Sequence, residues 1–180
     1  MRNENLPEVW LRGPLPSIPS LLQPVAHALL QALEEINAYL LDFDETLLWQ
    51  KPLGIASVGF HLQHIAGVQS RLFTYAKDEV LTETQLDYLS REGKEDSTIT
   101  LAFLLENLHH QTETSIEQLK QTDEAALTEV RYVGRRQIPS TVIGLLVHAA
   151  EHTMRHTGQL MITIKVLSKG SFNQPSGSYF

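Results

Sequence analysis

The sequence predicts an all-α protein built as a four-helix bundle, with an extended, proline-rich N-terminal arm and a possible short hairpin before the last helix. Three observations support this prediction: four long segments repeat apolar residues at helical spacing, strand-like alternation is scarce, and prolines cluster before residue 20. A chain of 180 residues is long enough to bury one sizeable core, so we expect residues 1–180 to form a single domain.

Residues 1–19 are expected to form the arm, with the first helix beginning directly behind them. Proline lacks a backbone N–H and disfavours helical geometry in the residue before it. The arm contains Pro7, Pro14, Pro16 and Pro19. Ser20-Leu21-Leu22-Gln23 has the spacing of a capping box. The sequence therefore predicts a helix from about residue 20 to about residue 43.

Three further helices are expected at about 56–77, from an N-cap at Asp96 or Ser97, and from Pro139 to about residue 167. The polar stretch of residues 78–97 should contain one short helical turn around residues 85–90. Residues 130–136 are expected to form either a small hairpin or a loop. The last helix should stop before Gly170, and residues 168–180 should form a tail.

Composition argues against several classes of function. The net charge is −7 and no long basic run occurs, so a nucleic-acid partner is not expected. No apolar run reaches the ~20 residues of a membrane span. The N-terminus lacks the apolar region of a signal peptide, so a cytoplasmic location is expected. Cysteine is absent, so any thiol chemistry must use a soluble thiol.

The last helix places His152 and His156 one turn apart on the stripe that should face the interior. Buried imidazoles need partners, because unpaired polar groups are costly to bury. A shared cation would satisfy both rings, and His64 on the second helix could complete a set of three ligands. A hydrogen-bonded polar layer, or a chance surface pair, explains the same spacing. The spacing alone leaves these interpretations open.

Two segments together resemble the DinB/YfiT-like superfamily. They are ASVGFHLQHIAGVQSRLFTYA, residues 56–76, and HAAEHTMRHTGQL, residues 148–160, in which the second histidine pair is followed by x-Gly-Gln. The resemblance implies a four-helix bundle whose metal site uses one histidine of the second helix and a His-x3-His pair of the last. On this match, His64, His152 and His156 bind one divalent transition metal. Zinc or nickel is expected first, and iron or manganese next.

Four residues are expected to support these ligands or to replace one of them: His61, His148, Glu151 and Gln159. His61 precedes His64 by three residues, which falls about 60° short of a helical turn, so both rings should not point equally at the last helix. His64 is preferred because it fits the family motif better.

Three residues near the ligands are weaker candidates for holding an anionic substrate or lining the mouth of a pocket: Arg71, Arg155 and Trp49. A surface salt bridge is the preferred explanation of the two arginines, and core packing explains Trp49 equally well. The string His148-Ala149-Ala150-Glu151-His152 also matches the H-x-x-E-H motif of some metallopeptidases. That interpretation is disfavoured, because it leaves His156 unused and such peptidases are generally far larger.

The resemblance implies a metal-dependent enzyme that uses a low-molecular-weight thiol to attack a small electrophile, as an S-transferase does. Its partners would be a small-molecule substrate and a soluble thiol. Two alternatives share the same site. One is a non-catalytic metal-binding or dimerising bundle of the stress-response kind, in which a homodimer is possible. The other is a metal-hydroxide hydrolase, which differs in its nucleophile.

Overall fold

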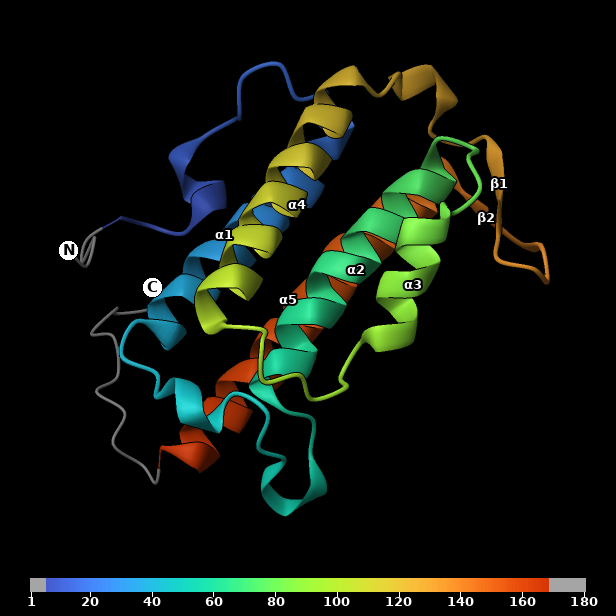
Figure 1. Ribbon diagram of the computed structural model, residues 1–180. Helices are drawn as coiled ribbons and strands as arrows, with labels where there is room; N and C mark the ends of the chain where they lie inside the picture. The colour runs from blue at the N-terminus through green and yellow to red at the C-terminus, as the bar shows by residue number, and fades with distance from the viewer. Residues whose placement is uncertain (1–5, 169–180) are drawn as a thin grey trace.

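The computed structural model describes residues 6–168, which form five α-helices and one small antiparallel sheet (Figure 1). The helices are α1 (Gln23–Leu40), α2 (Val58–Ala76), α3 (Glu83–Arg91), α4 (Leu101–Gln121) and α5 (Val142–Leu167), and the strands are β1 (Val130–Val133) and β2 (Ile138–Thr141). The mostly helical character agrees with the all-α prediction. Apart from Ser168, the expected tail lies outside the described residues, as do residues 1–5 of the expected arm.

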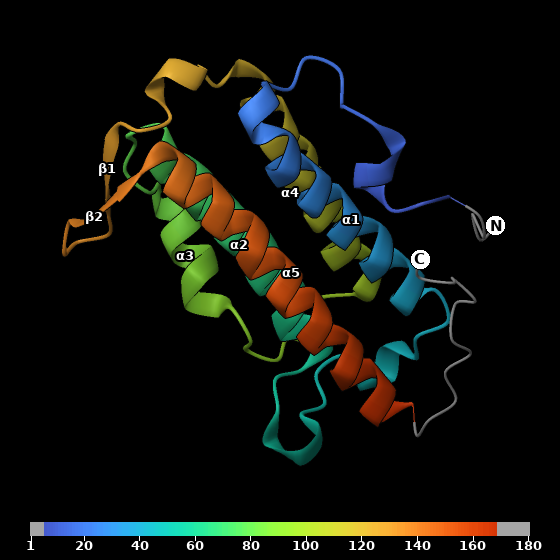
Figure 2. The same cartoon turned by 180° about the vertical axis from the view of Figure 1, so that it is seen from behind.

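The four long helices pack side by side in two layers. Helices α2 and α4 form the layer nearer the viewer in Figure 1, and α1 and α5 form the layer nearer the viewer in Figure 2. Each long helix packs on its neighbour in the same layer and on one helix of the other layer. Helix α2 packs on α4 and α5, and α1 packs on α5 and α4. Helix α2 runs opposite to α5, and the short helix α3 covers the outer side of α2.

The first helix does not begin with the capping box expected at Ser20. Residues Ser20–Leu22 instead form a 3-10 turn, and α1 starts at Gln23 without a side-chain cap. The Gln23 amide is already occupied, because it donates to the carbonyl of Leu15 and accepts from the Leu15 N–H. A capping box does form at α3, between Thr82 and Gln85, where the sequence had predicted only a helical turn.

The described part of the N-terminal arm is not simply extended. It contains the 3-10 helix η1 (Val9–Arg12), whose Val9 is buried. The Val9 N–H donates to the side chain of Gln31 on α1, and Arg12 pairs with Glu34 at 2.7 Å. The arm is therefore tied to the helices by polar contacts and by the buried aliphatic side chains of Val9 and Ile18.

A hairpin does precede the last helix, but it extends further than expected. Pro139 lies within β2, opposite Tyr132 of β1, rather than in the first turn of the helix. Helix α5 begins after Thr141, whose hydroxyl accepts the N–H of Gly144. The start of α4 is likewise later than predicted, because Thr100 provides its N-cap in place of Asp96 or Ser97.

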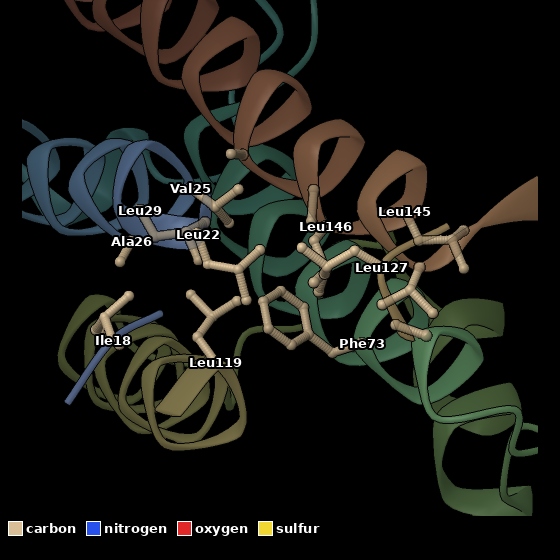
Figure 3. Close-up of a cluster of buried hydrophobic side chains, with 14 residues drawn as sticks. Ile18, Leu22, Val25, Ala26, Leu29, Phe73, Leu119, Leu127, Leu145 and Leu146 are labelled. Carbon is tan, nitrogen blue, oxygen red and sulfur yellow. The ribbon is translucent and has the colours of Figure 1, made fainter. Parts of the chain in front are cut away.

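Two clusters of buried apolar side chains form the core. Figure 3 shows the first, in which Leu22, Leu29, Phe73, Leu119 and Leu146 converge from α1, α2, α4 and α5 and the turn before α1. The second cluster lies toward the other end of α2 and α5 and includes Leu62 and Leu160. The apolar residues form stripes rather than continuous stretches, and none of the helices within residues 6–168 is long and apolar enough to cross a membrane.

Candidate metal centre

Two histidines of α2 face two histidines of α5 in the interior of the molecule. Because these helices run in opposite directions, the earlier histidine of each meets the later histidine of the other. Nδ1 of His61 lies 3.1 Å from Nδ1 of His156, and Nε2 of His64 lies 2.9 Å from Nε2 of His152. The structure thus brings the histidines of both sequence motifs into one cluster.

Three of these residues have the arrangement of a metal-binding set. His64, His152 and His156 offer ring nitrogens that all lie within 4.8 Å of one another, and all three side chains are half-buried. Nitrogens that share one cation at about 2.0–2.1 Å are roughly 3 Å apart. This is the separation already found between His64 and His152. These buried groups could hold a divalent metal ion, as the sequence predicted.

The surroundings favour neutral imidazole rings. Burial, followed by the neighbouring His64, lowers the pKa of His61 to about 4. Burial is also the main reason that the pKa of His156 falls to about 3, with smaller contributions from His64 and His152. The pKa of His152 is lowered for the same reasons. Near neutral pH these rings keep the lone pairs that a transition metal requires.

The hydrogen-bond partners of His152 bear on whether a metal ion fits the cluster. Nδ1 of His152 is buried and has no hydrogen-bond partner, while its Nε2 contacts His64. Without a cation, that contact requires one ring to donate an N–H to the lone pair of the other. A cation bound by both Nε2 atoms would take the place of that shared proton, whereas Nδ1 of His152 would remain without a partner. The donor set therefore fits a metal centre.

His64 has a second partner that sequence reasoning missed. Its Nδ1 lies 2.8 Å from Oε2 of Glu92, the C-cap residue directly after α3. The other carboxylate oxygen of Glu92 lies 2.5 Å from Nη1 of Arg71. Arg71 was expected to meet a substrate or to form a surface salt bridge. It is instead buried in an ion pair that extends to a candidate ligand.

The expectation that His61 and His64 would not point equally at the last helix is wrong, because both rings contact α5. His61 contacts His156, and His64 contacts His152. The two α2 rings point in directions about 60° apart, but their partners on α5 lie one turn apart, so both contacts can form. His61 is buried, and its nitrogens fall outside the set formed by His64, His152 and His156. His61 therefore lies beside a candidate ligand rather than in place of one.

The other candidates on α5 lie on its exposed side. Nδ1 of His148 is 3.3 Å from Oε2 of Glu151, and Glu151 also pairs with Arg155. His148, Glu151 and His152 form a second group whose ligand atoms lie within 4.8 Å, but its first two members are exposed. Gln159 is exposed as well. The surface salt bridge considered for Arg155 is thus present, and Glu151 already has a cationic partner.

Phe60 of α2 lies against the histidine cluster. The ring of Phe60 stacks on that of His64, with centroids 5.0 Å apart and an angle of 14° between the planes. Trp49, considered as a pocket residue, packs against the second apolar cluster and lies directly over Gly59. A cavity between α2, α3 and α4 and another between α1 and α4 are lined by other residues. The contacts of Trp49 with the apolar cluster and with Gly59 agree with core packing.

The fold and the cluster define a class of protein, namely a helical protein in which histidines from two neighbouring helices form a potential metal centre. The family model described as the DinB superfamily matches residues 21–160. The chain belongs to the DinB superfamily, as the two histidine motifs predicted. None of the curated proteins matches the chain.

Proposed function

We propose that this protein binds one divalent transition metal through His64, His152 and His156. The observation that carries the proposal is the convergence of three ring nitrogens from α2 and α5 within 4.8 Å, in surroundings that lower the pKa of two of these rings. Neutral imidazole is a good ligand for zinc and nickel, which we propose first, with iron and manganese as further candidates. Three protein ligands would leave a coordination position for a small molecule.

We further propose that the metal-loaded protein is a cytoplasmic enzyme that joins a low-molecular-weight thiol to a small electrophile. A bound divalent cation supplies Lewis acidity and lowers the pKa of a thiol or water molecule that it binds. The chain has no cysteine, so it cannot supply the sulfur nucleophile itself. The half-burial of the three histidines is consistent with access for a small molecule. The family resemblance supports the use of a thiol.

The metal site is tested by elemental analysis of untagged protein, which should contain about one transition-metal ion per chain. Metal-loaded protein is then incubated with an electrophile such as a halogenated aromatic compound, with and without added thiol. We expect turnover that requires both metal and thiol and is abolished by chelation. Equal consumption of electrophile without thiol would identify a hydrolase, in which water is the nucleophile. Bound metal without turnover over a broad panel of substrates would favour the non-catalytic bundle.

A further inference from the structure

Glu92 occupies an unusual position for a residue at the end of a short surface helix. Its side chain is only 6% exposed, and its two oxygens have separate partners on α2. Oε2 lies 2.8 Å from Nδ1 of His64, and Oε1 lies 2.5 Å from Nη1 of Arg71. A structural ion pair would need only the contact with Arg71. The second oxygen contacts a candidate metal ligand.

Several contacts hold this carboxylate in place. The N–H of Gly93 donates to the side-chain oxygen of Gln63 at 2.8 Å, and the hydroxyl of Tyr88 donates to the backbone oxygen of the same residue at 3.0 Å. Gly67 lies beneath the ion pair, and a methyl group at this position would overlap Oε1 of Glu92 and Nη1 of Arg71. The end of α3 is thus fixed to α2 on both sides of the carboxylate.

We propose that Glu92 is a positioning residue that fixes the tautomer and orientation of His64. An ionised carboxylate can only accept, so the 2.8 Å contact requires the proton of the His64 ring to be on Nδ1. The lone pair is then on Nε2, the atom that faces His152. Arg71 provides the countercharge for Glu92. This inference rests on the proposed metal site, since it assigns how one of its ligands is prepared for binding.

The arrangement makes an unusual prediction for Glu92→Gln. Arg71 has donors but no acceptor, so it should draw the amide oxygen of the new side chain to itself. The amide NH2 would then face Nδ1 of His64, which would have to accept. The ring proton would move to Nε2, and the lone pair would be lost from the side that faces His152. A purely structural ion pair predicts no such change.

The test uses metal-free protein labelled with 15N in its histidines, at pH 7.5, with the His64 signals assigned by comparison with His64→Ala. We expect the Nδ1–H tautomer of His64 in the wild type and the Nε2–H tautomer in Glu92→Gln. The Kd for Zn2+ should rise by about 10- to 100-fold in this variant. The double variant Glu92→Gln/Arg71→Met frees the amide oxygen to face His64, so it should recover the Nδ1–H tautomer. Glu95→Gln, an exposed change nearby, is the matched control.

The outcomes separate this inference from the metal proposal. If wild-type protein binds no Zn2+, Ni2+, Fe2+ or Mn2+, the proposed function fails, whatever the tautomer of His64. If the wild type binds Zn2+ and Glu92→Gln binds it equally well with an unchanged tautomer, the role of Glu92 is refuted. An Nε2–H tautomer of His64 in the wild type would refute it as well, so the inference stays testable even if Glu92→Gln fails to fold.

Discussion

The interior-facing side of α5 is apolar toward both ends of the helix and polar in the middle. Between Val142 and Ala150 it packs into the first apolar cluster, and from Leu160 to Ile164 it packs into the second. Between them, His152, Thr153, His156 and Thr157 are polar and at least half-buried. The two histidines contact His64 and His61 of α2, and these four rings form the histidine layer. Apolar burial contributes most of the stability of a folded domain, whereas buried polar groups must find partners. The comparison suggests that the two clusters stabilise the fold and that the histidine layer serves binding.

The largest effect should come from removing a ligand of the histidine layer. His64→Ala, His152→Ala and His156→Ala should each reduce the metal content from about one ion per chain to almost none, because two imidazoles hold a cation far more weakly than three. His109→Ala is the matched control, since His109 contacts Asn37 on α1 and lies outside the cluster. Elemental analysis checks the result. Full occupancy in all three ligand variants would refute the assignment of the site.

The apolar clusters should respond in the opposite way. Leu29 is fully buried in the first cluster, and Leu29→Ala should lower the free energy of unfolding by about 2–5 kcal/mol. Below its melting temperature, the variant should still bind about one metal ion, because α1 carries none of the three histidines. Urea denaturation of metal-free protein measures the loss of stability. If Leu29→Ala lost its metal while it remained folded, the apolar cluster would also be needed for metal binding, and the two roles would not be separate.

The histidine layer also predicts how stability depends on pH. Unfolded histidines bind a proton below a pH of about 6.5, but the pKa values of folded His61 and His156 are lowered to about 4 and about 3. Between these limits the unfolded state binds more protons, so the free energy of unfolding falls as pH falls from 6.5 toward 4. His64 and Arg155 face these rings and lower the pKa further, His64 for both rings and Arg155 for His156. Glu92 raises the pKa of the neighbouring His152, but burial, His64, His148 and Arg71 outweigh it, so the direction is not reversed.

Metal-free protein should be used for this measurement. Metal binding releases protons from its ligands, so bound metal would add a second pH dependence to the free energy of unfolding. Urea midpoints between pH 7 and pH 5 should decline in the wild type. In His61→Gln the decline should be smaller, since one of the buried rings that resist protonation has been removed. A midpoint that stays constant over this range would show that the folded rings accept protons as readily as the unfolded ones.

The parts that could be predicted from the sequence are those in which the signal is periodic. Helical spacing identified the four long helices, and the phase of His152 and His156 on α5 indicated their inward direction. Glu92 could not be found in this way. It lies 28 residues from His64 in the chain, and only the packing of α3 on α2 brings them together. The start of α1 was missed for a similar reason, because the side chain of Gln23 contacts Leu15 of the arm instead of capping the helix at Ser20.

The smallest expected effect concerns His61. It distinguishes the proposed metal ligand on α2, His64, from a histidine that only contacts a ligand. His61 is buried and contacts His156 through Nδ1 at 3.1 Å, but it lies outside the set of three. A neutral hydrogen bond contributes about 1 kcal/mol net, so His61→Ala should weaken metal binding by roughly fivefold. His64→Ala should abolish binding, although the two residues are only one turn apart. Titration of metal-free variants with Zn2+ compares them directly. If His61→Ala lost the metal and His64→Ala retained it, the ligand on α2 would be His61, and the carboxylate of Glu92 would have no metal ligand to orient.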